Sequence, residues 1–151
     1  MANQMTGSQQ RIMGIDFGTT RIGISLSDPL QIIAQPLTTL DNKPEVIERI
    51  CDIVVKEEIV LIVVGMPLNL KGEKGQKAQE VEKFIDELRL AAKVEVVHWD
   101  ERFTTSIAHQ TLLAMGTKRE ERRKKKGRVD SMAAAIMLQG FLDSRKRSMV
   151  C

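Results

Sequence analysis

The apolar positions along the chain change between two spacings, and the change predicts a mixed α/β protein. Segments near 11–17, 21–27 and 32–40 are short, rich in β-branched residues and separated by turn residues, which is typical of three strands in an antiparallel meander. Residues 45–57, 78–88 and about 105–115 instead place apolar side chains three and four positions apart, as amphipathic helices do.

Two further segments are apolar without alternation. Residues 60–64 resemble a strand covered on both faces, as at the centre of a parallel sheet, and residues 94–99 form another strand. A last helix is predicted to start near Asp130. The order β-β-β-α-β-α-β-α-α predicts a mixed sheet, a meander plus parallel strands, with helices on both faces.

The length of 151 residues suits one domain, so we expect a leader at 1–10, a single domain at 11–147 and a tail at 148–151. No apolar run approaches the roughly 20 residues that cross a bilayer, and the polar amino-terminal segment has no secretory signal pattern. Two cysteines make no disulfide framework, so we expect a cytoplasmic protein with no membrane partner. The aromatic content of 3% argues against a surface built on aromatic stacking.

Carboxylates stand at the ends of several predicted elements. Asp16 ends the first strand, Asp100 and Glu101 end the last strand, and Asp130 opens the last helix. Strand ends and a helix packed over them can converge, and unpaired carboxylates that converge repel one another. A divalent cation relieves this repulsion, and oxygen ligands favour Mg²⁺ or Mn²⁺. Two such ions can clamp the attacking and leaving oxygens of a phosphodiester.

Each carboxylate also has an ordinary structural explanation. Asp130 is a common helix N-cap type, Asp100 suits a turn, and Glu101 can pair with Arg102. If the strand pleat continues, Asp100 and Glu101 point to opposite faces, so only one of them can join Asp16. The sequence pattern alone does not choose between the two.

A basic segment precedes Asp130. Residues 118–128 hold eight basic and two acidic side chains, a local charge of +6 against +3 for the whole chain. Such a run is often only a solvated loop. Because it leads directly into a candidate metal ligand, we expect it to contact the phosphates of a polyanion, through Lys124, Lys125 and Lys126 among others.

Four stretches of the chain together resemble one family, the YqgF (RuvX) family of Holliday-junction-resolvase-like nucleases. They are Ile15-Asp16-Phe17-Gly18-Thr19-Thr20-Arg21-Ile22-Gly23, Val64-Gly65-Met66-Pro67-Leu68-Asn69, Trp99-Asp100-Glu101-Arg102-Phe103-Thr104-Thr105 and Arg128-Val129-Asp130-Ser131-Met132-Ala133-Ala134. One departure is Thr20, where many members of the family carry lysine. The resemblance implies a ribonuclease H-like fold.

The resemblance also implies a site. Asp16, Glu101 and Asp130 would be the catalytic, metal-binding carboxylates, with Asp100 as the less favoured ligand. Phosphate-contacting or supporting groups would be Arg21, Asn69, Arg102 and Arg128. The implied activity is Mg²⁺- or Mn²⁺-dependent hydrolysis of phosphodiester bonds in structured nucleic acid. The favoured reaction is the maturation of the 5′ end of precursor 16S rRNA.

Three alternatives stay open at this point. One is a Holliday junction resolvase acting on DNA, which would call for a homodimer with two sites. Another is a non-catalytic factor that binds RNA or the ribosome. The third is a phosphotransferase, because Asp16 to Thr20 also resembles the phosphate loop of the actin and sugar-kinase ATPases. Those proteins enclose ATP between two such domains, and this chain has the length of one.

Overall fold

The computed structural model describes the backbone of residues 10–67, 75–100 and 126–150, and the side chains of the same ranges except those of 126–128 and 146–150. The described strands and helices are β1 (Arg11–Phe17), β2 (Arg21–Ser27), β3 (Ala34–Asp41), α2 (Val46–Lys56), β4 (Ile59–Met66), α3 (Gln76–Ala92), β5 (Glu95–Asp100) and α6 (Lys126–Val150). Among these residues no helix is long and apolar enough to cross a membrane.

Five strands form one mixed sheet in the order β3-β2-β1-β4-β5. The first three pair antiparallel, whereas β1, β4 and β5 run parallel to one another. The predicted meander and parallel strands are therefore confirmed. Because parallel strands end at one edge of a sheet, the carboxyl ends of β1, β4 and β5 lie at the same edge, where α/β proteins bind ligands.

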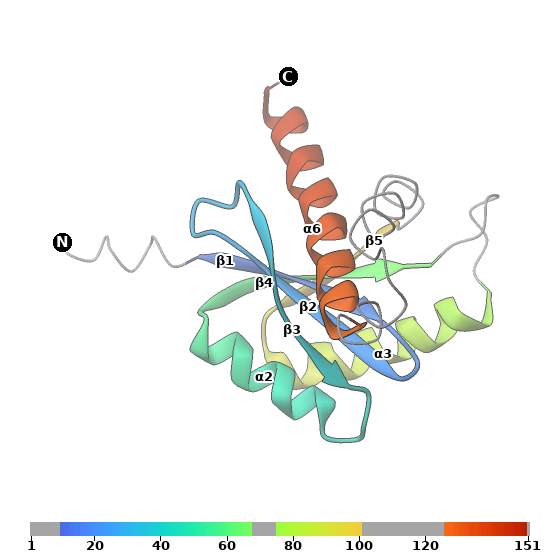
Figure 1. The fold of residues 1–151 in the computed structure, drawn as a ribbon. Helices are drawn as coiled ribbons and strands as arrows, with labels where there is room; N and C mark the ends of the chain where they lie inside the picture. Colours follow the sequence, from blue (N-terminus) through green and yellow to red (C-terminus); the bar gives the residue numbers. More distant parts are fainter. Residues whose placement is uncertain (1–9, 68–74, 101–125, 151) are drawn as a thin grey trace.

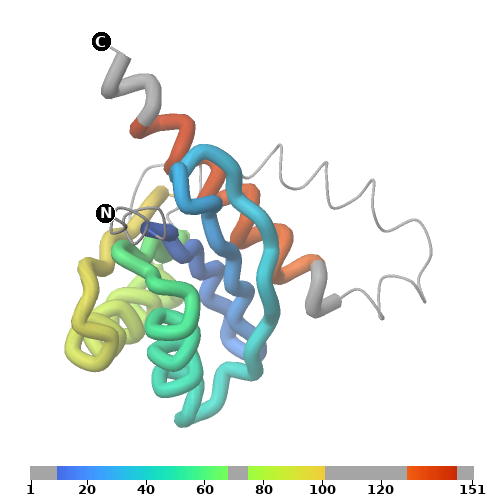
Figure 2. Tube along the Cα trace, turned by 90° about the vertical axis from the view of Figure 1, so that its left-hand side faces the viewer, coloured from blue at the N-terminus to red at the C-terminus, as the bar shows by residue number. Residues whose placement is uncertain are grey.

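Helices cover both faces of this sheet, as predicted (Figure 1). Helices α2 and α3 lie on one face and α6 crosses the other, a division that is also clear in the turned view of Figure 2. The larger core cluster fills the α2/α3 face and includes Ile15 and Ile24 of the central strands. The smaller cluster joins α6 to β1 and β4 through residues such as Ile12, Val63 and Leu138.

Helix α6 packs unusually close to the sheet. A Cβ atom on Gly14 of β1 would lie 2.8 Å from the Cβ of Leu138, so a glycine is needed for this approach. Further along the helix, Gln139 holds the start of β3: the amide of Ala34 donates to its Oε1 at 2.8 Å, and its Nε2 donates to the carbonyl of Ile32 at 2.9 Å. These contacts fix the position of α6, and with it the position of Asp130.

Strand β3 begins at Ala34, two residues later than expected. The amides of Ile32 and Ile33 donate to Oδ1 of Asp28 at 2.7 and 2.8 Å, so they are not available to the strand ladder. Desolvation raises the pKa of Asp28, but backbone donors, among them Ile33, Ile32 and Leu30, outweigh it and the pKa lies below its usual value.

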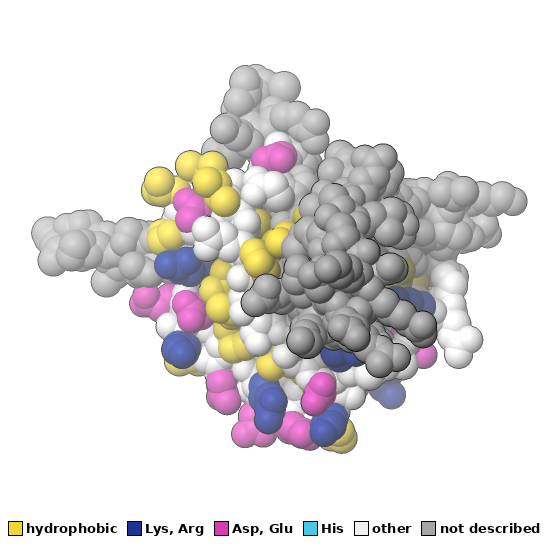
Figure 3. Space-filling view, in the orientation of Figure 1, with side chains coloured by type: hydrophobic (Ala, Val, Ile, Leu, Met, Phe, Trp, Pro, Cys, Tyr) yellow, Lys and Arg dark blue, Asp and Glu magenta, His cyan; other side chains and the backbone are white. Residues whose placement is uncertain are grey.

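The exposed surface is uneven. Apolar side chains gather on the hairpin between β2 and β3, where Leu30 is 73% and Ile33 is 56% exposed. Figure 3 shows this patch at the upper left, and shows acidic and basic side chains interspersed over the lower part of the same view. The apolar hairpin lies at the start of β1, the opposite end of the strand from Asp16.

The last helix differs from the prediction. It begins at Lys126 and runs to Val150, so Asp130 lies inside the helix rather than at its N-cap, and the helix extends through most of the segment expected to be a tail. Lysine and arginine are good helix formers, which allows the helix to start before Asp130. The predicted helix near 105–115 lies outside the described residues.

Candidate active site

Asp16 lies near the carboxyl end of β1 and is half-buried. Its neighbours Ile15 and Phe17 belong to the core on the α2/α3 face. Gly14 faces Ala134 and Leu138 of α6. Because successive side chains of a strand point to opposite faces, Asp16 shares the α6 face with Gly14. The carboxylate is thus carried at the sheet edge where β1, β4 and β5 end, on the face that α6 covers.

Gly23 of β2 brings Asp130 to the same place. Gly23 is the ladder partner of Asp16, and paired Cα atoms in an antiparallel ladder are about 4.5–5.5 Å apart. A Cβ atom on Gly23 would overlap the backbone carbonyl of Asp130 and lie 3.0 Å from the amide nitrogen of Ser131. The backbone at Asp130 therefore packs directly on Gly23, and Asp16 lies beside the same glycine in the sheet, although Asp16 and Asp130 are far apart in the sequence.

An ion pair holds the carboxylate of Asp130. The Nε of Arg21 donates to Oδ2 of Asp130 at 2.6 Å, and the two side chains are 28% and 25% exposed. Arg21 begins β2 on the same face as Gly23, so the ion pair follows from the strand pleat. A charge-assisted hydrogen bond of this length fixes the orientation of the carboxylate before any ligand arrives.

Asp100 ends β5 on the other face of the sheet. Val96 packs in the core on the α2/α3 face, whereas Val97 and Trp99 pack against α6, where the ring of Trp99 lies 5.7 Å from that of Phe141. By the strand alternation Asp100 shares the face of Val96, opposite to Asp16. The sequence could not give this assignment, because it depends on which helix each face meets.

The other predicted site residues fall into two groups. Glu101, Asn69, Arg102, Lys124 and Lys125 lie outside the described residues, so their roles stay predictions. The backbone of Lys126 and Arg128 forms the first turn of α6, one turn before Asp130. Within the described ranges no three His, Cys, Asp or Glu side chains group as a metal site. Two of the three predicted ligands, Asp16 and Asp130, lie within those ranges, and the third, Glu101, lies outside them.

The role of Gly23 is visible only in the structure, although the residue belongs to the motif that contains Asp16. A glycine inside an otherwise apolar, β-branched strand marks a place where another backbone approaches closely, and that signal was present. What approaches it could not be known from the pattern.

Comparison with known proteins gives a consistent result. The family model RuvX, described as Holliday junction resolvase, matches residues 10–144. The chain is 39% identical over 135 residues to a protein of Sulfurihydrogenibium sp., covering 88% of this chain and 90% of the relative, and 42% identical over 142 residues to one of Chlorobaculum tepidum, covering 92% and 97%. A protein of Acetivibrio thermocellus is 42% identical over 139 residues, covering 89% and 96%. All three carry the name "Putative pre-16S rRNA nuclease".

Solved structures give the fold. RuvC of T. thermophilus, in complex with a Holliday junction substrate, superposes with a TM-score of 0.55 at 14% identity, covering 91% of this chain and 96% of that one. The Holliday junction resolvase of fowlpox virus superposes with a TM-score of 0.55 at 9% identity, covering 89% and 99%. At these identities the likeness concerns the fold alone, and it confirms the predicted ribonuclease H-like sheet.

Proposed function

Because the chain belongs to the RuvX family of Holliday junction resolvases, we propose that it is a divalent-metal-dependent nuclease that hydrolyses phosphodiester bonds in structured nucleic acid. The observation that carries the proposal is that Gly23 is the ladder partner of Asp16 and that the backbone of Asp130 packs directly over it. The substrate we favour is precursor 16S rRNA, which appears in the names of the relatives. Junction DNA is the alternative, favoured by the description of the family model.

The proposed ligand set is Asp16, Asp130 and Glu101. Asp16 and Asp130 supply carboxylate oxygens on one face of the sheet, and such oxygens suit Mg²⁺ or Mn²⁺. Asp100 shares the opposite face, and continuing the pleat by one residue would turn Glu101 toward the face of Trp99 and α6. The geometry therefore supports Glu101 over Asp100 as the third ligand.

The chain's own groups have separate tasks in this proposal. A bound divalent ion would supply an activated water and stabilise the negative charge that develops on the phosphate. Asp16 and Asp130 would hold the ion at the sheet edge. Arg21 would leave Asp130 and donate to a phosphate oxygen of the substrate, since guanidinium groups match phosphate geometry.

The basic segment supports a polyanionic substrate. Residues 118–128 run into α6, and the first turn of that helix contains Lys126 and Arg128, close in sequence to Asp130. Phosphate contacts by these groups, together with Lys124, Lys125, Asn69 and Arg102, would bring the backbone of the nucleic acid toward the carboxylates. The homodimer expected for a four-way junction stays a prediction.

The direct test is a cleavage assay with two substrates. Precursor 16S rRNA and a synthetic four-way DNA junction are each incubated with the protein in Mg²⁺, in Mn²⁺ and in chelator. We expect cleavage of the RNA in either metal and none in chelator. Cleavage of the junction alone would favour the DNA alternative. Binding that is steep in salt but without cleavage of either substrate would favour a non-catalytic RNA-binding factor.

A second prediction concerns Arg21. Arg21→Gln is expected to bind Mn²⁺ about three- to tenfold more tightly, because a cation no longer competes for Asp130 and no longer repels the incoming ion. The same variant should cleave RNA more slowly, because a phosphate contact is lost. Calorimetric titration of Mn²⁺ measures the first effect and the cleavage assay the second.

The control for this prediction is Arg49→Gln, which removes the same charge from an exposed position on α2. It should change neither quantity. If Arg21→Gln bound Mn²⁺ as the wild type does, or more weakly, Arg21 would be an orienting group for Asp130 and not a competitor of the metal.

A further inference from the structure

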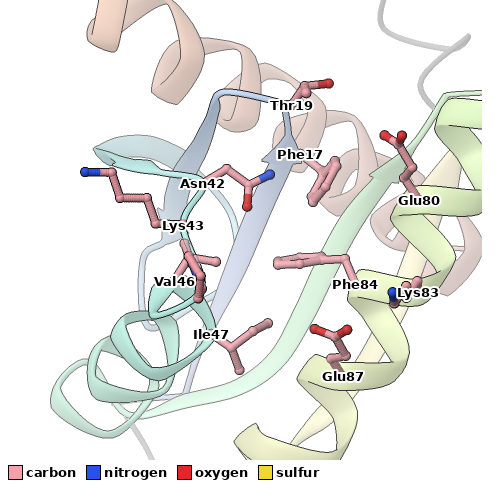
Figure 4. Close-up of a pocket in the computed structure, with 11 residues that line it drawn as sticks. Phe17, Thr19, Asn42, Lys43, Val46, Ile47, Glu80, Lys83, Phe84 and Glu87 are labelled. Carbon is pink, nitrogen blue, oxygen red and sulfur yellow. The ribbon is translucent and has the colours of Figure 1, made fainter.

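A pocket of about 420 Å³ lies on the α2/α3 side of the sheet, where β1 ends beside the first turn of α2 and the middle of α3. Figure 4 shows Phe17 of β1 and Phe84 of α3 pointing toward each other, with Asn42 on one side of them and Glu80 of α3 on the other. The volume is within the range of small-molecule sites. Nothing in the activity proposed above uses this pocket.

The interior of the pocket is aromatic. The ring centroids of Phe17 and Phe84 are 4.9 Å apart with an interplanar angle of 51°. Phe84 is only 6% exposed and belongs to the core, so its ring is fixed, while Phe17 is half-buried beside it. Phe84 therefore holds the ring of Phe17 in place, and the exposed part of Phe17 gives a planar ligand a surface on which to stack at small entropic cost.

The charges around the pocket cancel. Lys43 comes from the connection between β3 and α2, and Glu80, Lys83 and Glu87 come from α3, so two basic and two acidic groups line the same opening. Because two charges of each sign are present, the rim offers neither a phosphate nor a metal ion a net electrostatic attraction. An uncharged planar group that both donates and accepts hydrogen bonds suits an aromatic floor with such a rim.

The pocket and the candidate active site share the end of β1, on opposite faces of the sheet. Phe17 follows Asp16 in β1, and consecutive residues of a strand present their side chains to opposite faces. The β1–β2 turn that separates the two faces is held by Asn42, whose Nδ2 donates to the carbonyl of Gly18 at 2.8 Å and whose amide donates to Thr20 at 2.9 Å. A single nucleic-acid strand laid across this turn would pass from Asp16 on one face to the pocket on the other.

From this arrangement we infer that the pocket binds one unstacked nucleobase of the strand whose phosphate lies at Asp16 and Asp130. The inference rests on the proposed function. RNA that is read as a single strand is held in this way, with bases splayed out and stacked on aromatic side chains. The low aromatic content excludes an extended stacking platform, but the fold brings two of the four phenylalanines into one pocket, which is enough for one base.

The test uses single-stranded oligoribonucleotides of precursor 16S rRNA sequence that carry one 2-aminopurine at successive positions. Fluorescence is measured with the protein in chelator, so that binding is observed without cleavage. We expect quenching at one position of the strand. Phe17→Leu keeps an apolar side chain but removes the ring, and it should bind that oligonucleotide about tenfold more weakly. Leu90→Ala, at an 85% exposed position of α3, is the matched control and should bind as the wild type does.

A second measurement needs no variant and therefore holds if Phe17→Leu does not fold. The same oligonucleotides carry 5-iodouridine in place of 2-aminopurine and are irradiated with the wild-type protein. We expect a cross-link to Phe17 or Phe84 from the position that showed quenching. Adenosine monophosphate is titrated in parallel to separate a strand nucleotide from a free one.

The outcomes separate the two proposals. Quenching at one position that is lost in Phe17→Leu, or a cross-link to either phenylalanine, supports the base site. The inference is overturned by uniform quenching without a cross-link, by a Phe17→Leu variant that folds and binds as the wild type does, or by adenosine monophosphate binding as tightly as the oligonucleotide. Since binding is measured in chelator and cleavage in Mg²⁺, the absence of cleavage would reject the proposed function without deciding the base site.

Discussion

Asp16→Asn is expected to reduce cleavage of precursor 16S rRNA about a thousandfold or more in Mg²⁺. The substitution keeps the size of the side chain but removes the charge of a proposed metal ligand, at the point where Asp130 approaches Gly23. A catalytic metal supplies several kcal/mol of transition-state stabilisation, and each ~1.4 kcal/mol corresponds to a factor of ten in rate. Single-turnover cleavage with enzyme in excess measures the effect on the chemical step.

The matched control is Asp52→Asn, which makes the same change at an exposed position of α2 and should cleave at the wild-type rate. The same assay distinguishes Asp100, which ends β5, from Glu101, which follows it. Glu101→Gln should resemble Asp16→Asn, whereas Asp100→Asn should retain cleavage because its side chain shares the other face of the sheet. Wild-type cleavage by a folded Asp16→Asn variant would remove the metal site from the proposal.

Gly23→Ala is expected to impair both stability and cleavage. The added methyl group would overlap the backbone carbonyl of Asp130, and a backbone atom cannot move aside by a change of rotamer. The start of α6 must shift instead, at a cost of about 1–3 kcal/mol for overpacking. Because a displacement of about 1 Å at a catalytic group can cost about a hundredfold in rate, the cleavage rate should fall by about that factor even under conditions in which the variant is fully folded.

Thermal unfolding and the cleavage assay together check this prediction. A loss of about 1–3 kcal/mol corresponds to a fall of roughly 2–12 °C in the unfolding midpoint of a chain of this size. Gly75→Ala is the control, since a Cβ atom at Gly75 would meet nothing within 4 Å and its backbone angle suits any residue. A Gly23→Ala variant as stable and active as the Gly75→Ala variant would show that α6 does not rest on Gly23.

Much of the fold could be predicted because its signals are local. The alternation and helical spacing of apolar residues gave β1, β2, β4, β5, α2 and α3 to within a few residues of their bounds. The errors occurred where a side chain or a partner element intervenes. Asp28 takes the amides that would have begun β3 two residues earlier, and the segment before Asp130 continues α6 instead of capping it.

The candidate site divides in the same way. The sequence identified Asp16 as a charge that a strand does not explain, and it placed Asp100 and Glu101 on opposite faces without choosing between them. The choice required knowing that Trp99 packs against α6 and Val96 against the other core. The ion pair between Arg21 and Asp130 had no signal in the sequence, because the two residues are 109 positions apart.

The sequence by itself determined the elements, the order in which they occur and the acidic residues proposed as metal ligands, because backbone preference and side-chain periodicity act over a few neighbouring residues. Only the tertiary structure decided that Asp130 packs over the ladder partner of Asp16, which face of the sheet each acidic residue shares and that Phe17 and Phe84 line one pocket. Those facts depend on strand register and on the seating of α6 against Gly14 and Gly23, and both come from packing between segments distant in the chain.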